Sequence, residues 1–202
     1  MTPVLPQAAA VLLAAGASSR MGRPKPLLDF EGETFLDRQI HLYAGVCKPV
    51  IAVLGHSASE IASGLRRADQ ATLVLNPQPE RGQLSSLQCG LRALPACDAV
   101  FFLPIDSPGV RPGTLAELLR AMHAAPEHDF VIPRHVGRRG HPVLMRAAVV
   151  EEFLALNVSA SARDVVHAHR DSTLYVDVDD PAIHFDIDDP AAYQALLEGA
   201  RS

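Results

Sequence analysis

The sequence predicts an α/β protein of three layers, in which helices cover both faces of a mostly parallel central sheet. The first observation behind this prediction is that short apolar runs alternate with helical patterns along the whole chain. The second is composition, because hydrophobic residues make up 48% of the 202 residues and charged residues 20%, as in globular proteins. The third is that no linker, repeat or low-complexity tract interrupts the chain. We therefore expect a single domain over residues 1–202.

Five apolar segments have the length of strands and are bounded by Gly, Pro or polar residues. Their positions are 8–14, 50–54, 72–75, 99–103 and 130–132. Apolar residues follow one another in these segments, which is typical of strands buried on both faces of a parallel sheet. We therefore expect all five to be buried strands.

Helical periodicity occupies most of the sequence between and after these segments. It predicts helices at 34–44, 57–68, 84–94, 112–123, 147–156, 163–169 and 190–199. The last helix starts with Asp189-Pro190, an N-cap acceptor followed by a proline that suits the first helical position. Because ligands of such sheets bind beyond the carboxyl ends of the strands, the segments that follow the strands are where we expect a site.

Charge and cysteine content exclude several classes of protein. The 18 Lys and Arg residues against 23 Asp and Glu give a net charge of −5, which disfavours binding to nucleic acid or to an anionic membrane. The first cation is Arg20, so the apolar N-terminal run lacks the basic start of a signal peptide. Cys47, Cys89 and Cys97 share no metal-binding spacing and lie among apolar neighbours. We expect buried, reduced thiols in a cytoplasmic protein.

The segment after the first strand, residues 15–25, suits a polyphosphate. It is rich in small residues, so backbone N–H groups can approach an anion closely, and it carries the cations Arg20, Arg23 and Lys25. It is neither a Walker loop nor a G-x-G-x-x-G loop, because its two glycines are too far apart and Lys25 does not follow the second one directly. The alternative interpretation is an ordinary basic turn.

Two later strands are also followed by polar groups. Asn76, Gly82 and Ser85 come after the third strand, in a pattern typical of a helix entrance that can bind an anion or a sugar hydroxyl. The alternative there is a plain N-cap. Asp106 comes after the fourth strand between two prolines, where a carboxylate can hold a hard cation. Its alternative is a loop aspartate that accepts hydrogen bonds from turn N–H groups.

The C-terminal half contains two charged segments. Arg138, Arg139 and His141 lie between glycines, which predicts a mobile cationic loop for a second anionic substrate. The alternative is a solvated basic turn. Residues 177–189 contain six aspartates, whose mutual repulsion is costly unless solvent or a metal ion neutralises it.

The first loop resembles a known signature. Nucleotidyltransferases with a glycosyltransferase-A-like, Rossmann-like fold carry a motif similar to Leu13-Ala14-Ala15-Gly16-x-Ser18-x-Arg20-Met21-Gly22-x-x-Lys25. The resemblance is greatest to the molybdenum-cofactor nucleotidyltransferases. In that family the loop wraps the triphosphate of a nucleotide. The resemblance implies that Arg20 and Lys25 stabilise charge on the α-phosphate and the departing pyrophosphate.

The same resemblance implies a set of nucleotide contacts. A family pattern N-x(5)-G-x-x-S, which lines the base and ribose pocket, fits Asn76, Gly82 and Ser85. The implied nucleotide-binding residues are Leu13, Ala14, Ala15, Gly16, Ser18, Arg20, Gly22, Lys25, Asn76, Gly82 and Ser85. The implied catalytic residues are Arg20, Lys25 and Asp106.

A metal site follows from the resemblance as well. The aspartate of the family's x-x-D-x-P pattern, Asp106 in this sequence, binds Mg²⁺. One aspartate of a later D-x-D-x-P-x-x-Y pattern joins it, and we favour Asp188 over Asp186 for this second ligand.

The acceptor site is implied by the string from Gly137 to Leu144, which is similar to a motif of the molybdopterin cytidylyltransferase branch. The residues expected to bind the acceptor are Arg138, Arg139 and His141. A second string of that branch, G-D-x-G-A-R, keeps only Ala162 and Arg163 here.

The implied function is Mg²⁺-dependent transfer of a nucleoside monophosphate to the phosphate of the molybdopterin cofactor, with release of pyrophosphate. Ala14-Ala15-Gly16 is the variant associated with cytidine enzymes, so we expect CTP rather than GTP as the donor. Two alternatives remain open. One is transfer to a sugar phosphate or another alcohol phosphate, and the other is a non-catalytic nucleotide-binding or cofactor-delivery module for a molybdoenzyme.

Overall fold

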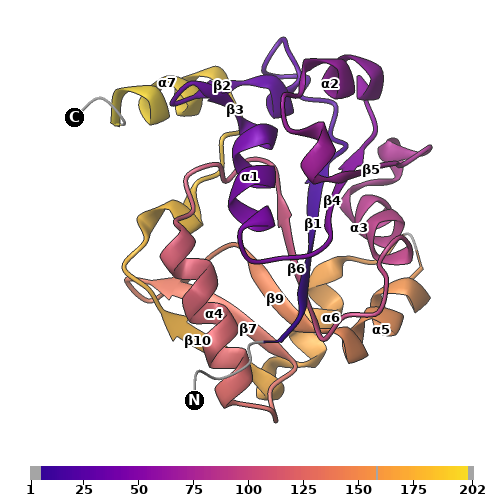
Figure 1. The fold of residues 1–202 in the computed structure, drawn as a ribbon, viewed down its shortest axis with the longest axis vertical. Coiled ribbons are helices and arrows are strands. Elements are labelled where there is room, and N and C mark those ends of the chain that lie inside the picture. The colour runs from indigo at the N-terminus through magenta and orange to yellow at the C-terminus, as the bar shows by residue number, and fades with distance from the viewer. Residues whose placement is uncertain (1–5, 158, 200–202) are drawn as a thin grey trace.

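A sheet of eight strands forms the centre of the computed structural model, which describes residues 6–157 and 159–199 (Figure 1). Seven strands lie in the order β10-β7-β9-β6-β1-β4-β5, and β8 pairs with β7. β9 runs antiparallel to β6 and β7, β8 runs antiparallel to β7, and the other neighbouring strands are parallel. The strands are β1 (Ala8–Ala14), β4 (Val50–Leu54), β5 (Thr72–Leu75), β6 (Ala99–Pro104), β7 (Phe130–His135), β8 (Arg138–Arg139), β9 (Val143–Arg146) and β10 (Thr173–Asp177).

Helices cover both faces of this sheet. The α-helices are α1 (Phe35–Ala44), α2 (Ala58–Gly64), α3 (Gln83–Arg92), α4 (Pro112–Ala124), α5 (Val150–Ala155), α6 (Ala162–Ala168) and α7 (Pro190–Gly199). Short 3-10 helices occupy Lys25–Leu27, Ala68–Gln70, Pro79–Arg81, Ala147–Val149, Arg170–Ser172 and Pro181–His184. A separate hairpin pairs β2 (Asp29–Phe30) with β3 (Glu33–Thr34). The arrangement confirms the predicted three-layer α/β/α fold.

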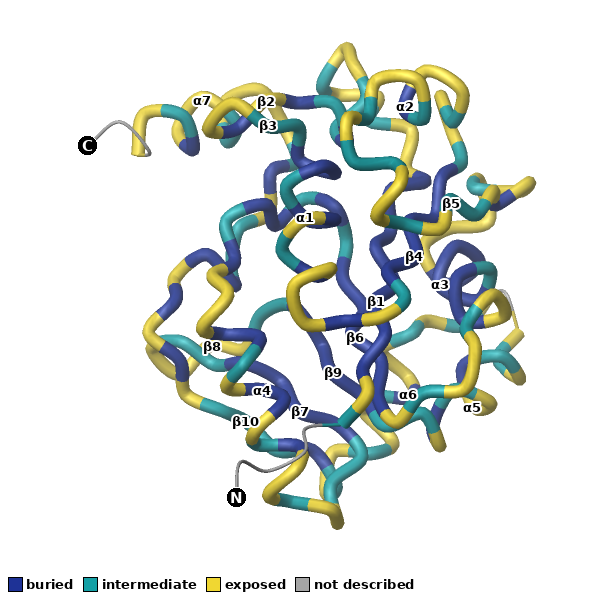
Figure 2. The backbone as a smooth tube through the Cα atoms, viewed as in Figure 1, coloured by how far each residue is buried: buried dark blue, intermediate teal, exposed yellow. Residues whose placement is uncertain are grey.

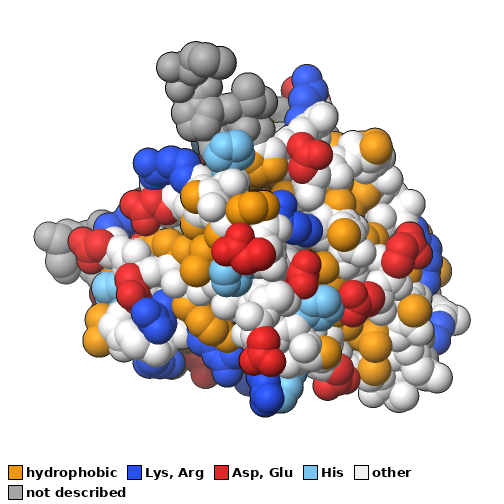
Figure 3. Space-filling view, turned by 90° about the horizontal axis from the view of Figure 1, so that it is seen from below, with side chains coloured by type: hydrophobic (Ala, Val, Ile, Leu, Met, Phe, Trp, Pro, Cys, Tyr) orange, Lys and Arg blue, Asp and Glu red, His pale blue; other side chains and the backbone are white. Residues whose placement is uncertain are grey.

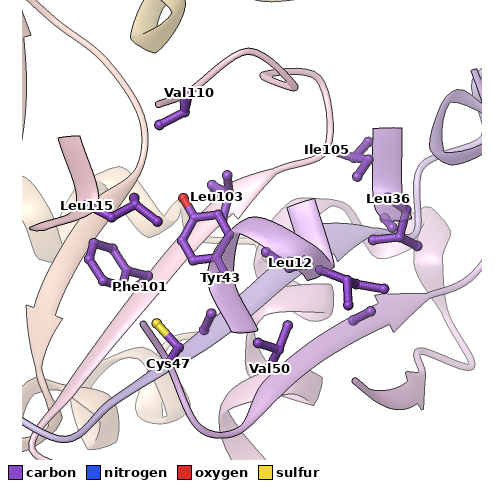
Figure 4. Packing of buried hydrophobic residues seen from close by; sticks show 14 of the residues in the cluster. Leu12, Leu36, Tyr43, Cys47, Val50, Phe101, Leu103, Ile105, Val110 and Leu115 are labelled. Carbon is purple, nitrogen blue, oxygen red and sulfur yellow. The ribbon is translucent and has the colours of Figure 1, made fainter. Parts of the chain in front are cut away.

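The central strand β1 divides the hydrophobic core in two, because successive side chains of a strand point to opposite faces. Leu12 belongs to a buried cluster that includes residues of α1, α2, α4 and α7, whereas Val11 and Leu13 belong to a second cluster with residues of α3, α5 and α6. In the first core the ring of Tyr43 meets that of Phe101 edge-on, with centroids 5.6 Å apart (Figure 4). Figure 2 shows that the backbone is buried along the inner strands and mostly exposed in the connecting loops.

Two expectations about strands were wrong. β5 is exposed or half-buried along its length, with Leu75 61% exposed, because it is the edge strand and has a neighbour on one side only. The segment 137–144, predicted as a mobile loop, contains β8 and the first residues of β9. β9 pairs with both β6 and β7, which holds this segment inside the sheet. The other predicted strands are confirmed, with β6 and β7 somewhat longer than expected.

The predicted helices are confirmed with shifted ends. The helix expected at 57–68 ends at Gly64, and the one expected at 147–156 is divided into a 3-10 turn and α5. At the start of α1 the hydroxyl of Thr34 accepts a hydrogen bond from the amide of Asp37 (3.1 Å). At the start of α7 a carboxylate oxygen of Asp189 accepts one from the amide of Ala192 (2.8 Å), as the sequence predicted.

The expectation that the cysteines are buried and reduced is confirmed only in part. All three thiols are free, but only Cys47 is buried, whereas Cys89 and Cys97 are half-buried, so the expectation of full burial was wrong for these two. Within the described part of the chain, the structure contains no helix with the length and apolar character needed to cross a membrane. On the face seen from below, acidic, basic and hydrophobic side chains are interspersed (Figure 3).

Candidate functional site

A cavity opens at the carboxyl ends of β1 and β6. The amide of Ile105 donates a hydrogen bond to the carbonyl of Leu13 (3.1 Å), which keeps the two strands side by side up to the loop that contains Asp106. The cavity has a volume of about 290 Å³. Its lining comes from residues 13–20, Lys25, Pro26, Pro79, Gly82, Gln83, Ser86, Ile105, Asp106 and Asp188.

The loop after β1 is folded tightly by its own hydrogen bonds. Ser18 has a φ of 52° and Gly22 a φ of 68°, and the hydroxyl of Ser18 accepts a hydrogen bond from the amide of Lys25 (2.9 Å). A Cβ atom added at Gly16 would meet no other atom within 4 Å. The glycine is therefore not needed for packing, and its small size keeps space open in the cavity. The structure thus brings the predicted residues Leu13, Ala14, Ala15, Gly16, Ser18, Arg20 and Lys25 together around one cavity.

Three carboxylates gather at the edge of this cavity. One oxygen each from Asp106, Asp186 and Asp188 lies within 4.8 Å of the others. The amide of Ile187 donates to the carbonyl of Asp106 (3.2 Å), and the hydroxyl of Ser107 donates to the carbonyl of Phe185 (2.7 Å). These bonds hold the C-terminal segment against the end of β6. The structure therefore places both candidates for the second metal ligand beside Asp106.

The pKa values of these carboxyl groups are shifted in opposite directions. Burial raises the pKa of Asp106 to about 6, Lys25 opposes that rise, and the negative charge of Asp186 adds to it. The pKa of Asp188 is instead lowered, first by its hydrogen bond with Lys25. The ammonium of Lys25 lies 2.5 Å from one oxygen of Asp188, and the guanidinium of Arg20 lies 3.1 Å from the other. Closely spaced oxygen ligands with unneutralised charge at Asp106 fit a Mg²⁺ ion, which prefers one or two carboxylates.

Part of the predicted base and ribose pocket is structural. Asn76 is 2% exposed, and its side-chain amide donates to the hydroxyls of Ser85 (2.9 Å) and Ser86 (3.0 Å). Asn76 and Ser85 therefore fasten the loop to α3 beneath the cavity, and neither lines it. Gly82 does line it, together with Gln83 and Ser86, which the sequence interpretation missed. Two adjacent serines on a helix cannot be told apart by spacing alone.

A second, larger cavity of about 950 Å³ lies beyond the aspartates. Arg138, Arg139 and His141, predicted to bind the acceptor, all line it. The guanidinium of Arg139 lies over the ring of Tyr175 and donates to its hydroxyl (3.2 Å). Sequence reasoning assigned no site role to four more arginines and histidines that line this cavity, Arg163, His167, Arg170 and His184. The retained Ala-Arg pair at 162 and 163 was the available signal for Arg163.

The surroundings of His141 within this cavity disfavour its protonated form. Its backbone amide donates to the carbonyl of Ile183 (2.9 Å), and a Cβ atom at the preceding Gly140 would collide with that same carbonyl. Burial lowers the pKa of His141, and the nearby charge of Arg163 lowers it further. The ring nitrogen Nδ1 is buried and has no hydrogen-bond partner among the described residues. A neutral imidazole with an unused nitrogen suits a hydrogen bond to a substrate.

The fold and a match to a family model together identify the chain as a nucleotidyltransferase. Residues 10–173 match the family described as the MobA-like NTP transferase domain, and the chain belongs to this family. The resemblance seen in the sequence is thereby confirmed. The nucleoside triphosphate is the substrate that the family supports.

Proteins similar in sequence to this chain have several different activities. The molybdenum cofactor cytidylyltransferase of Escherichia coli K12 is 28% identical over 135 residues, which cover 67% of this chain and 68% of that protein. A nicotine blue oxidoreductase from Paenarthrobacter nicotinovorans is 32% identical over 165 residues, 78% of this chain and 79% of that protein. A molybdenum cofactor guanylyltransferase from Sinorhizobium fredii is 38% identical over 112 residues, 55% and 50% of the two chains.

Solved structures share the fold over almost the whole chain. The protein Rv0371c from Mycobacterium tuberculosis H37Rv superposes with a TM-score of 0.82 at 28% identity, over 97% of this chain and 100% of that one. A structure of Rv0371c in complex with manganese superposes with a TM-score of 0.76 at 26% identity, over 95% and 98%.

Proposed function

We propose that this protein transfers CMP from CTP to the phosphate of a molybdopterin-type acceptor, with Mg²⁺ bound and pyrophosphate released. One observation carries the proposal. The small cavity beside the cationic loop and the large cavity beside the arginines meet at Asp106 and Asp188. A donor in one cavity and an acceptor in the other would face each other at these carboxylates, where charge on the reacting phosphates can be neutralised.

The transfer needs no protein nucleophile. An oxygen of the acceptor phosphate attacks the α-phosphorus of the triphosphate, a new P–O bond forms, and the bond to the β-phosphate oxygen breaks. The attacking phosphate is already ionised, so no proton has to be removed from it. Arg20 and Lys25 stabilise the negative charge that accumulates on the departing pyrophosphate.

The metal proposal rests on the donor atoms present. Asp106 and Asp188, with Asp186 next to them, would hold one Mg²⁺ through oxygen ligands. The ion supplies neutralisation of phosphate charge when it is bound. The manganese complex of a similar protein supports a divalent metal in this fold. To bind the ion, the carboxylate of Asp188 has to give up its ion pairs with Lys25 and Arg20. These two cations then become available to the phosphates.

CTP is the proposed donor because Ala15, the middle residue of the Ala14-Ala15-Gly16 variant associated with cytidine enzymes, lines the nucleotide cavity. A Cβ atom at Gly55 would lie 2.8 Å from Cβ of Ala15 and 2.7 Å from Cβ of Pro79, so these three residues pack closely. Ala15 and Pro79 both line the cavity. The methyl group of Ala15 restricts close approach of a base to the backbone more than a glycine would, which favours a pyrimidine over a larger purine. Titration of CTP and GTP in the presence of Mg²⁺ tests this choice, and tighter binding of GTP would overturn it.

The size and charge of the second cavity support a large anionic acceptor. Its volume of about 950 Å³ exceeds what a simple sugar phosphate requires, and four arginines line it, namely Arg138, Arg139, Arg163 and Arg170. A molybdopterin phosphate meets both conditions. The close approach of Arg20, Lys25 and Asp106 around one cavity argues against a non-catalytic nucleotide-binding or cofactor-delivery module.

A single assay separates the candidate functions. Pyrophosphate release is measured with each nucleoside triphosphate and Mg²⁺, against molybdopterin and a panel of sugar phosphates and other alcohol phosphates. The proposal predicts release with CTP and molybdopterin. Because one relative is a nicotine blue oxidoreductase, a parallel reaction contains nicotine blue and a reduced nicotinamide cofactor. Loss of the dye colour without pyrophosphate release in any reaction would replace the proposed function by an oxidoreductase activity.

A further inference from the structure

Three residues line both cavities, and one of them has no assigned role. Asp106 and Asp188 are the proposed metal ligands, and the third is Gln83. Gln83 is the first residue of α3, directly after Gly82, whose φ of 93° and ψ of −177° belong to a region that essentially only glycine adopts. The boundary between the cavities is thus formed by two carboxylates and one neutral amide.

The side chain of Gln83 is free, in contrast to its neighbours. It is exposed and makes no hydrogen bond to any residue that the structure describes. Gln78 accepts a hydrogen bond from Arg81 (2.6 Å), and Gln88 donates to the carbonyls of Phe153 (2.8 Å) and Leu156 (3.0 Å). Of these three glutamines on and next to α3, Gln83 is the one whose side chain makes no hydrogen bond at all within the described part of the chain.

We propose that Gln83 contacts the reacting phosphates of the transfer proposed above, on which this inference rests. Its Nε2 donates a hydrogen bond to an oxygen of the α-phosphate where donor and acceptor meet. Carboxylates cannot donate, and Arg20 and Lys25 line the nucleotide cavity only. Gln83 is the neutral donor on the α3 side of that boundary, so it can bind the phosphate without competing with the metal for the aspartates.

The contribution of Gln83 is greatest in the transition state. When the acceptor oxygen bonds to the α-phosphorus, the equatorial oxygens of that phosphorus have to be fixed while the pyrophosphate leaves. A donor placed at the cavity boundary holds these oxygens in line between the two cavities. The remaining contacts of the triphosphate would come from residues 13–25, to which the side chain of Gln83 makes no hydrogen bond in the described part of the chain. Gln83 should therefore affect turnover more than nucleotide affinity.

The test compares Gln83→Ala and Gln83→Glu with the matched control Gln194→Ala, an exposed glutamine on α7. We expect Gln83→Ala to lower kcat by about 10- to 100-fold, as for loss of one hydrogen bond to a charged group. CTP affinity measured by calorimetry should stay within about twofold of wild type, since one contact of many is removed. Gln83→Glu should lower kcat further than Gln83→Ala does. It should also raise the KM of the acceptor, because an additional carboxylate at the boundary repels the phosphates of both substrates. Gln194→Ala should match wild type.

A second readout does not require turnover. The ³¹P resonance of the α-phosphate of bound Mg·CTP should differ between wild type and Gln83→Ala, whereas the β and γ resonances and the Gln194→Ala spectrum should not. Equal α-phosphate resonances in wild type and Gln83→Ala would overturn the inference, as would an unchanged kcat. Parallel loss of CTP affinity and thermal stability in Gln83→Ala would make Gln83 a structural residue instead. Absence of pyrophosphate release by the wild type would refute the proposed function alone, and the resonances would still decide the role of Gln83.

Discussion

The ammonium nitrogen of Lys25 lies 2.5 Å from a carboxylate oxygen of Asp188, across 163 residues of sequence. Arg20 contacts the other oxygen of the same carboxylate at 3.1 Å. The cations assigned to the triphosphate thus pair with a carboxylate assigned to the metal. A triphosphate competes with Asp188 for these cations, and a metal ion competes with the cations for Asp188. Binding of the triphosphate therefore frees Asp188 for the metal ion, and binding of the metal ion frees Lys25 and Arg20 for the triphosphate.

This exchange predicts cooperative binding of metal and nucleotide. Asp188→Asn removes the competitor of the phosphates, so it should tighten the binding of metal-free CTP by about fivefold, a typical value for a partly exposed ion pair. The same variant should weaken the binding of Mn²⁺. Calorimetry with CTP alone and with Mn²⁺ alone measures both effects. Asp179→Asn, at an exposed aspartate outside both cavities, is the control. Weaker binding of metal-free CTP to Asp188→Asn would contradict the exchange.

Asp106→Asn should keep the fold and lose the reaction. Burial raises the pKa of Asp106 to about 6, so the folded protein disfavours the carboxylate at every pH above the ordinary value of 3.8. A neutral isostere removes that penalty, and the melting temperature at neutral pH should stay equal or rise. Turnover should fall by about 100-fold or more, since metal stabilisation of phosphate charge is worth several kcal/mol.

Thermal melts measure the stability of Asp106→Asn, and pyrophosphate assays measure its turnover. Asp69→Asn, at an exposed aspartate, is the control for both measurements. A drop in melting temperature of more than about 4 °C, roughly the effect of 1 kcal/mol in a domain of this size, would show that Asp106 has a structural role.

Much of this site could be predicted because it depends on the ends of strands. Asp106 follows a strand with clear apolar character, and in a parallel sheet such positions converge at one edge. The pairing of Asp106 with Asp188 was predicted from the family resemblance, since 82 residues separate them and no local rule connects them. The structure adds that Asp186 belongs to the same cluster, in which one oxygen of each aspartate lies within 4.8 Å of the others.

The errors have physical causes as well. β8 and β9 are short, and β8 lies between two glycines, so their pairing with β7 and β6 depends on neighbours distant in sequence. Asn76 has the side chain of a ligand-binding residue, but the same amide can satisfy two buried serine hydroxyls. Local sequence does not distinguish these uses. Tertiary contacts decide them.

Arg139→Ala should affect the acceptor and leave the nucleotide unaffected. Arg139 lines only the larger cavity, where it lies over Tyr175 and binds its hydroxyl. Loss of one charge-assisted contact costs about 1.5–3 kcal/mol, so the KM of the acceptor should rise by roughly 10- to 100-fold. Steady-state kinetics with each substrate varied in turn measures this, with Arg120→Ala on the exposed side of α4 as the control. Equal weakening of CTP and acceptor would assign Arg139 to a structural or triphosphate-binding role.

A histidine with two carboxylate partners connects the wall of the acceptor cavity to the sheet. His169, which follows α6, binds Asp129 through Nδ1 and Glu152 through Nε2, both at 2.8 Å. The hydroxyl of Ser172 donates to the same oxygen of Asp129 (2.7 Å). Both ring nitrogens can donate only when the imidazole is protonated. The hydrogen bond with Glu152 is the largest cause of the raised pKa of His169, and burial opposes it.

The raised pKa predicts a pH-dependent stability. A histidine whose pKa is higher in the folded protein stabilises the fold fully below its ordinary value of 6.5, and this contribution disappears as the pH rises through the raised value. For Asp129, burial raises the pKa, but hydrogen bonds from Ser172 and His169 outweigh it and lower it overall, so its carboxylate is ionised throughout that range. Urea unfolding should therefore show that His169→Asn loses about 1 kcal/mol relative to wild type near pH 6 and much less near pH 9. His123→Asn, at an exposed histidine of α4, should give no such difference. A loss of stability in His169→Asn that is equal at both pH values would mean that the ring acts through packing against Phe130 and not through its charge.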